Sequence, residues 1–271
     1  MVPKRETDIG ELAEWLAEDR FPVDKRIAPV EIAESVKIGV IWGCYGDQFD
    51  GILEHDKGRF FIYVNLDRAE SPTSPRARFT VGHELGHYFI SEHRNALKSG
   101  LTPRHPSHCD YESKNPTEIE ADHFASCLLM PSQRFCKRAK KFGPGLNGIC
   151  QLANDFGTSL TSTAIRYAKL DLMRCVIIKW DSDGYGWKWL SPSAYASGWR
   201  KTIETPAELL NGSATEIVLS GAVPQGKVIL RGSTASSWFP FISDGSAQND
   251  ILREEAISLG RFGGLTLLSL G

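Results

Sequence analysis

The sequence lacks the features that define several large classes of protein. No stretch approaches the roughly 18 consecutive apolar residues of a membrane-spanning helix, and the N-terminal segment has no apolar core of a secretion signal. The six cysteines form no C-x-x-C pair, which argues against a disulfide framework and a zinc ribbon. The 31 basic and 33 acidic side chains leave a net charge of −2, so nothing attracts the whole chain to nucleic acid or anionic lipid. We therefore expect a cytoplasmic protein with reduced thiols and no membrane contact.

What is present is a chain of globular composition with two unlike halves. Its 271 residues are 41 % hydrophobic, which is enough to form two domains with buried cores. All seven histidines fall between residues 55 and 123, whereas five of the seven tryptophans lie beyond residue 175. The two halves therefore have different roles, and the first is where chemistry is expected.

Apolar periodicity and turn signals predict an α+β fold. The predicted helices span residues 8–20, 28–36, 75–92, 116–129 and 132–142, and two more lie within 147–170. The predicted strands span residues 37–43, 49–54 and 59–65 and form a small antiparallel sheet, while residues 93–115 are predicted as a long loop. The chain then divides into a first domain over residues 1–142, a helix-turn-helix-like extension over 143–170 and a β-rich accessory domain over 171–271.

The predicted helix over residues 75–92 contains an H-E-x-x-H motif at residues 83–87. At about 100° per residue, positions 83 and 87 differ by only about 40°, so His83 and His87 project from one face and can bind a single ion. Glu84 lies about 100° further round, where a general base can take a proton from water without binding the metal. Packing is the alternative role for the histidines, but Val81 and Leu85 belong to a separate apolar stripe that can anchor the helix.

A catalytic zinc site usually has a third protein ligand, and the predicted helix over residues 116–129 offers one. Glu118 and Asp122 are four residues apart and share a face of that helix. Glu118 can bind the metal, while Asp122 accepts a hydrogen bond from the distal nitrogen of one ligand histidine. Alternatively, Glu118 only favours the start of the helix, since it follows the possible N-cap Asn115 at capping-box spacing. Glu120 points away from this face.

Together these spacings resemble the ImmA/IrrE family of metallo-endopeptidases. The matching positions are Asn65, residues 76–80, residues 83–87, Glu118, Ala121, Asp122, Phe124, Ala125 and residues 128–131. The likeness covers about residues 25–170, with a weaker one over residues 254–260.

The resemblance implies a zincin-like fold in which Zn²⁺ is bound by His83, His87 and Glu118. It implies that Glu84 is the catalytic base and that Asp122, where the family often has asparagine, orients a ligand. It also implies a cytoplasmic protease that acts in stress response by cleaving a regulatory protein, often a helix-turn-helix transcriptional repressor.

Other residues are weaker candidates for the same site. Stabilising the oxyanion is a candidate role for several side chains that are otherwise surface or loop residues, namely His93, His105, His108, His123 and Tyr111. Cys109 is a candidate redox-sensitive ligand that blocks the metal, with an inert loop thiol as the alternative.

Two further hypotheses concern partners. Residues 151–169 resemble a helix-turn-helix and follow a basic run over 134–141, so the alternative function is a DNA-binding or partner-binding regulator with a structural metal. Direct DNA binding is disfavoured, because the second of these helices offers only Arg166 and Lys169 as basic contacts. A protein substrate is favoured instead, and Phe60–Val64 is predicted to be an edge strand on which an extended substrate adds. The accessory domain could sense a small ligand or hold the substrate.

Overall fold

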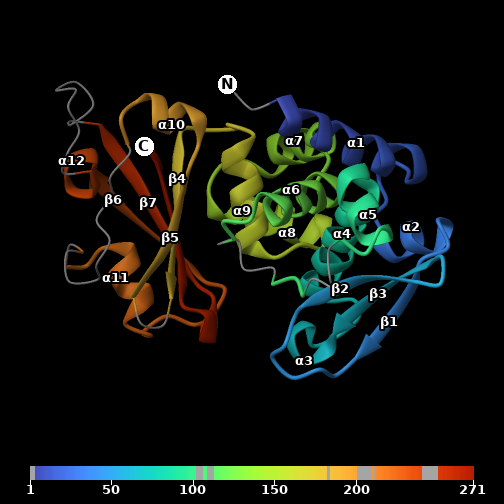
Figure 1. The fold of residues 1–271 in the computed structure, drawn as a ribbon. Helices are drawn as coiled ribbons and strands as arrows, with labels where there is room; N and C mark the ends of the chain where they lie inside the picture. Colours follow the sequence, from blue (N-terminus) through green and yellow to red (C-terminus); the bar gives the residue numbers. More distant parts are fainter. Residues whose placement is uncertain are drawn as a thin grey trace. The chain divides into compact units, whose positions relative to one another are not determined.

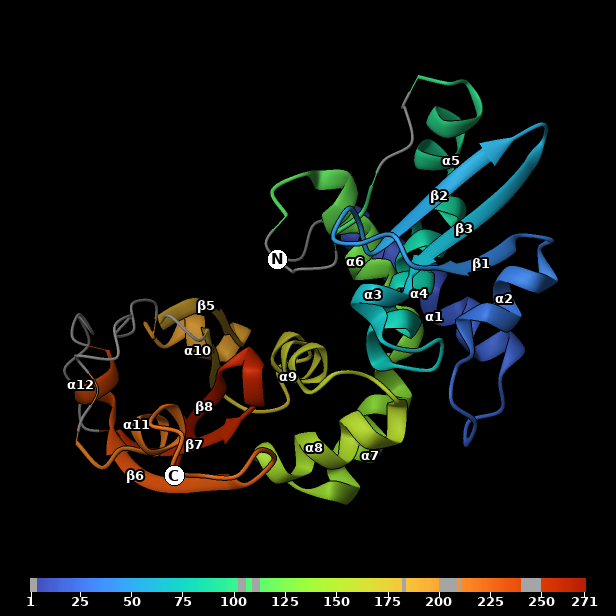
Figure 2. The same ribbon diagram turned by 90° about the horizontal axis from the view of Figure 1, so that it is seen from below.

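The computed structural model describes residues 4–101, 106–108, 113–181, 184–199, 209, 211–239 and 250–271 (Figures 1 and 2). The chain separates into two compact units. The N-terminal unit comprises Met1–Phe135 and Ala153–Ser159, and the C-terminal unit comprises Cys136–Leu152 and Leu160–Gly271. Both units contain helices and strands, so the fold is α+β as predicted. The predicted domain borders after residues 142 and 170 stay predictions.

The sheet of the N-terminal unit has three strands, β1 (Gly39–Gly43), β2 (Gly51–Asp56) and β3 (Arg59–Asn65), in the order β1-β3-β2. A two-residue turn joins β2 to the antiparallel β3. Both turn residues have positive φ, 46° at Lys57 and 80° at Gly58, which is the geometry that matches the twist of a tight hairpin.

The prediction of a wholly antiparallel sheet is wrong, because β1 runs parallel to β3. Only β2 and β3 are joined by a tight turn, whereas the longer connection after Gly43 carries the chain past β3 before β2 begins. The central strand is therefore β3, which is hydrogen-bonded to a neighbour on both sides. The predicted edge at Phe60–Val64 is also wrong. The edge strand that contacts α4 (Pro75–Phe89), the helix with the H-E-x-x-H motif, is β2.

Helices make up most of the N-terminal unit. They are α1 (Lys4–Arg20), α2 (Pro29–Ser35), α3 (Leu66–Ala69), α4 (Pro75–Phe89), α5 (Ser91–Lys98) and α6 (Pro116–Leu129). The two that carry the candidate ligands begin in the same way. The side chain of Ser74 accepts a hydrogen bond from the N–H of Ala77, that of Asn115 accepts one from Thr117, and each cap is followed by proline.

The predicted helix over 75–92 is in fact two helices. Ile90 has an extended backbone, with φ −71° and ψ 111°, and its side chain is buried, so α4 ends at Phe89 and α5 begins at Ser91. The prediction of a loop over 93–115 is accordingly wrong for residues 93–98. No proline or glycine marks the break in the sequence. We attribute it to the tertiary packing of the Ile90 side chain, which overrides local helix propensity.

Helices α4 and α6 approach each other closely because α4 presents glycine to α6. A Cβ added at Gly86 would lie 3.1 Å from the Cα of Ala121 and 3.2 Å from the Cβ of Phe124. Buried apolar side chains on both helices, including Val81, Leu85 and Phe124, continue the contact into the main core of this unit. The close approach brings the histidines of α4 to the first turns of α6.

Three further helices follow, α7 (Ser132–Phe142), α8 (Leu146–Phe156) and α9 (Leu160–Lys169), close to their predicted bounds. Not all of their basic side chains are exposed. Arg134 is buried and donates to the carbonyl oxygens of Phe21 and Pro22. Arg166 is buried, and Lys169 lies over the ring of Trp189.

The C-terminal unit is β-rich, as predicted. Its antiparallel sheet has the order β5-β4-β8-β7-β6. The strands are β4 (Cys175–Asp181), β5 (Gly184–Leu190), β6 (Val228–Thr234), β7 (Ile251–Ser258) and β8 (Gly264–Leu270), with the short helices α10 (Pro192–Ala196), α11 (Ala214–Leu219) and α12 (Ala235–Trp238) and a 3₁₀ turn, η3 (Gly260–Phe262). The core contains the buried rings of Trp180, Trp199 and Trp238.

No helix within the described ranges is both long enough and apolar enough to cross a lipid bilayer.

Candidate metal centre

The structure brings the three predicted metal ligands to one point. His83 and His87 come from the same face of α4, and Glu118 comes from the first turn of α6; all three are buried. The Nε2 atoms of the two histidines are 3.1 Å apart. The Glu118 oxygens lie 3.2 Å from Nε2 of His83 and 3.3 Å from Nε2 of His87.

This geometry fits a tetrahedral metal ion. Ligand atoms bound to zinc at about 2.0–2.1 Å in a tetrahedron are roughly 3.3 Å from one another. The three separations here are 3.1, 3.2 and 3.3 Å. Two imidazoles and one carboxylate are also a donor set that catalytic zinc takes, with a fourth position left for water. The residues present therefore fit a catalytic divalent ion.

Charges at the site favour an ionised Glu118. Burial raises the pKa of this carboxyl, but hydrogen bonds to His83 and His87 hold it well below its usual range. Burial lowers the pKa of His83, while hydrogen bonds to Asp122 and Glu118 raise it, to about 10 without a metal. Without a metal, His83 thus holds a proton beside the Glu118 carboxylate, and metal binding must displace it.

Asp122 holds one of the histidines in a binding orientation. Its Oδ1 lies 2.8 Å from Nδ1 of His83, so it accepts that N–H and leaves Nε2 facing Glu118. Asp122 follows Glu118 by one turn of α6, the spacing from which the sequence predicts this role.

Glu84 is fully buried beside the site without joining the ligand atoms. Its burial raises the pKa of the carboxyl to about 7, although the charge of His83, the Ser107 hydroxyl and the backbone of Leu53 oppose the shift. Leu53 belongs to β2, and Ser107 pairs with β2, because its N–H donates to the carbonyl of Gly51. A carboxyl that titrates near neutrality is suited to accept and return a proton.

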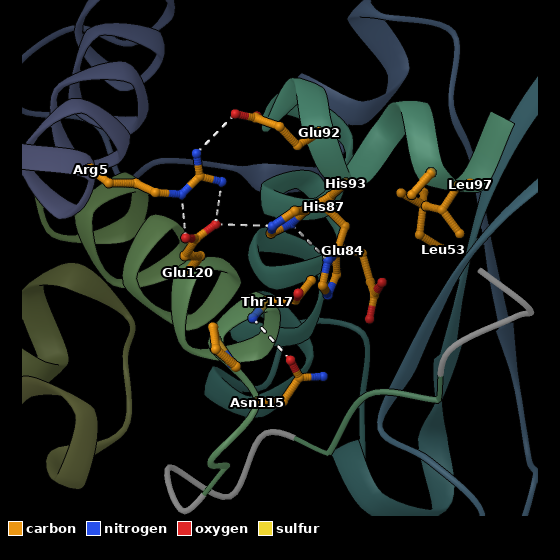
Figure 3. A pocket seen from close by; sticks show the side chains of 12 residues that line it. Arg5, Leu53, Glu84, His87, Glu92, His93, Leu97, Asn115, Thr117 and Glu120 are labelled. Atoms are coloured by element: carbon orange, nitrogen blue, oxygen red, sulfur yellow. Dashed lines mark hydrogen bonds and ion pairs between the residues drawn. The ribbon is translucent and has the colours of Figure 1, made fainter. Parts of the chain in front are cut away.

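A pocket of about 430 Å³ opens beside Glu84 and His87 (Figure 3). It is lined by residues of α1, β2, α4, α5 and α6 and by the N-cap of α6, namely Arg5, Leu53, Glu84, His87, Glu92, His93, Ala96, Leu97, Asn115, Pro116, Thr117 and Glu120. One side is apolar, with Leu53 and Leu97, and the other is polar.

His93 contacts the site in a way that the sequence did not indicate. Its Nδ1 lies 3.2 Å from Nδ1 of His87, and its Nε2 lies 3.0 Å from Glu120. The sequence predicted only a weak oxyanion role for His93 and turned Glu120 away from the ligand face. No sequence signal marks the break at Ile90. Because α5 begins after this break, His93 comes to lie beside His87.

Among the described residues, the sequence candidates His123 and His108 do not join these atoms. His123 lies elsewhere on α6, where its Nε2 donates to the carbonyl of Glu6, and His108 is exposed. The predicted candidates His105, Cys109 and Tyr111 lie outside the described residues.

Known proteins match the part of the chain that contains this site. The IrrE N-terminal-like domain of the M78 peptidases matches residues 54–167. Metallopeptidase ImmA of Bacillus subtilis strain 168 is 30 % identical over 102 residues, which cover 37 % of this chain and 52 % of that protein. The chain thus spans about half the length of this curated relative.

A Mycobacterium tuberculosis transcriptional regulator has a similar fold, with a TM-score of 0.61 over 97 % of this chain and 76 % of that chain at 13 % sequence identity. At this identity the likeness concerns the fold alone. The His83, His87 and Glu118 triad lies inside the segment matched by the family. Residues 54–167 are therefore similar to the IrrE N-terminal-like domain of the M78 peptidases, and part of the chain is similar to metallopeptidase ImmA.

Proposed function

We propose that this chain is a zinc-dependent endopeptidase that cleaves a regulatory protein, with a zincin-like N-terminal unit. The observation that carries the proposal is the convergence of three ligand atoms, 3.1–3.3 Å apart, next to the buried carboxyl of Glu84. Zinc is the metal that this donor set and spacing favour.

Each residue has a separate part in the proposed mechanism. His83, His87 and Glu118 would hold the ion, which when bound acidifies water toward neutral pH and polarises the substrate carbonyl. Glu84 takes the proton of the attacking water on its carboxylate and then gives it to the nitrogen of the leaving amine. Burial raises the pKa of this carboxyl, to about 7 without a metal, and so helps it to hold the proton between the two transfers.

The pocket supports an extended peptide as substrate. Leu53 belongs to β2, and it lines the pocket with Glu84 and His87. Among the described residues, the outer edge of β2 is paired only at its start, by the bridge between Gly51 and Ser107. A peptide that pairs with β2 would pass its backbone beside the ligand atoms. By the family resemblance, we propose a helix-turn-helix transcriptional repressor as the substrate class, within a stress response.

The variant Glu84→Gln tests this function. It keeps the size of the side chain and should retain zinc and the fold, but an amide cannot take up the proton, so cleavage should fall by about 10²–10⁴-fold. The measurement is the rate at which purified, zinc-loaded protein generates new N-termini in repressors encoded beside its gene, mapped by mass spectrometry.

The matched control is Glu31→Gln, the same change at an exposed position of α2. It should cleave like the parent. If Glu84→Gln also cleaves like the parent while binding zinc, then proteolysis through this site is not the function, and a binding role with a structural metal becomes the better explanation.

A further inference from the structure

His93 joins the metal centre to charged residues at the mouth of the pocket (Figure 3). His93 is buried at the start of α5, and its ring lies between Nδ1 of His87, at 3.2 Å, and Oε2 of Glu120, at 3.0 Å. Glu120 is in turn held by Arg5 of α1, whose Nη2 donates to Oε2 at 2.7 Å and whose Nε donates to Oε1. Three residues from three helices thus line up behind one ligand.

The protons on this chain of contacts can be assigned from chemistry. Nε2 of His87 faces Glu118 and His83, so it must be free of its proton to bind a metal ion. The proton of His87 is then on Nδ1, and the atom in position to accept it is Nδ1 of His93. The proton of His93 is then on Nε2, where it is donated to the Glu120 carboxylate. A single tautomer of each ring thus satisfies both the contact of His87 with His93 and that of His93 with Glu120.

We propose that His93, Glu120 and Arg5 form a positioning relay that fixes His87 in the tautomer and orientation that bind the metal. The proposal rests on the proposed function, since it concerns the same metal site. His93 acts on His87 as Asp122 acts on His83. Each accepts a hydrogen bond from the Nδ1–H of its ligand histidine and leaves Nε2 facing the metal position.

The choice of a neutral acceptor for His87 has an electrostatic reason. Glu84, Glu118 and Asp122 already place three carboxyl groups around the ligand atoms. A fourth in contact with His87 would crowd buried negative charge. A neutral imidazole accepts this hydrogen bond without adding charge beside the metal ligands. The carboxylate of Glu120, to which His93 donates, lies further from them, and Arg5 balances its charge.

The test is the zinc affinity of variants at position 93, measured by competition with a chromophoric chelator. His93→Phe keeps a ring but removes the acceptor, and we expect zinc to bind about 10–100-fold more weakly, as for other residues that orient a ligand. His93→Asn places an amide oxygen near the position of Nδ1, so its affinity should stay within about threefold of the parent.

Two more variants define the relay. Glu120→Ala leaves His93 in place but without its partner, so the loss should be smaller than for His93→Phe; Glu120 is also near the surface, so this variant should fold. Glu31→Gln is the control, because Glu31 is exposed on α2 and belongs to neither the relay nor the pocket lining. Its zinc affinity should equal that of the parent.

A spectroscopic measurement separates positioning from packing. In the zinc-loaded parent, the Nδ1 proton of His87 should give a protected downfield ¹H resonance. This signal should persist in His93→Asn and disappear in His93→Phe. The Co²⁺-loaded protein should show the same division, with altered visible absorption bands in His93→Phe alone.

Two results would overturn the relay. One is an unchanged zinc affinity in His93→Phe, and the other is an equal loss in His93→Phe and His93→Asn, which would mean that the ring only fills space. Because cleavage is not measured, the two proposals fail separately: a protein that binds zinc with the expected variant series and cleaves nothing overturns the protease, not the relay.

Discussion

The position of Glu84 depends on a residue without a side chain. Gly51 begins β2, and a Cβ added there would lie 2.5 Å from Cγ2 of Thr80 and 2.7 Å from Oε1 of Glu84. Such distances are shorter than van der Waals contact. The backbone of β2 can therefore lie directly on the carboxyl, and this contact excludes water from it and raises the pKa of Glu84.

We expect Gly51→Ala to separate catalysis from metal binding. The added methyl group must push the Glu84 carboxylate aside, so cleavage of a substrate of the parent should fall at least about tenfold. Zinc affinity should be unchanged, because Gly51 does not touch the three ligands. The control is Gly232→Ala in β6, where a Cβ would have no neighbour within 4 Å. A Gly51→Ala protein with full activity would show that Glu84 does not need its present position.

At the scale of elements, the local signals were predictable and the long-range ones were not. The features that could be predicted each depend on residues within one or two helical turns of one another. They are the motif at residues 83–87, the caps at Ser74 and Asn115 and the spacing of Glu118 and Asp122. The pairing of β1 with β3 and the break at Ile90 depend on contacts with distant residues, which no local pattern encodes. The contact of His93 with His87 was missed for the same reason, since only the fold of α5 brings the two rings together.

The contact between α4 and α6 is expected to control both stability and metal binding. In Gly86→Ala the methyl group would meet the backbone of Ala121 at 3.1 Å, so the helices must separate. We expect a loss of about 1–3 kcal/mol in the free energy of unfolding. Zinc affinity should fall too, because Glu118 moves away with α6. The measurements are urea denaturation and chelator competition.

Gly82→Ala is the matched control on the same helix. There the nearest atoms are 3.4 Å or more from the added Cβ, which is ordinary contact, and alanine also favours a helix. If both variants behave alike, the close approach at Gly86 is not what places Glu118.

At the scale of the whole molecule, each of the two units buries a glutamate side chain, and the two glutamates have different roles. The N-terminal unit buries Glu84 beside the ligand atoms. The C-terminal unit buries Glu254 in a structural network, where its carboxylate accepts from the N–H and hydroxyl of Thr215, each at 2.8 Å. The Thr215 hydroxyl lies 2.7 Å from that of Thr266, which accepts from Nε1 of Trp180 at 3.0 Å. This network ties α11, β7, β8 and β4 into one core.

Glu254 should make the C-terminal unit less stable as the pH rises. Burial raises the pKa of this carboxyl above its usual value near 4.5, against the hydrogen bonds from Thr215. The folded state therefore holds a proton that the unfolded state has already released, so the free energy of unfolding falls with pH above that value. Glu254→Gln cannot ionise and still offers a carbonyl to Thr215, so it should show less of this fall and be at least as stable as the parent at pH 7.

Urea denaturation at pH 5 and pH 7, followed by tryptophan fluorescence, measures this difference. The signal reports mainly on the C-terminal unit, where Trp180, Trp199 and Trp238 are buried. Glu216→Gln on α11 is the control, and it should keep the pH dependence of the parent because that side chain reaches solvent. A parent and a Glu254→Gln variant that lose stability equally between the two pH values would mean that Glu254 folds in its charged form, fully compensated by the Thr215 hydrogen bonds.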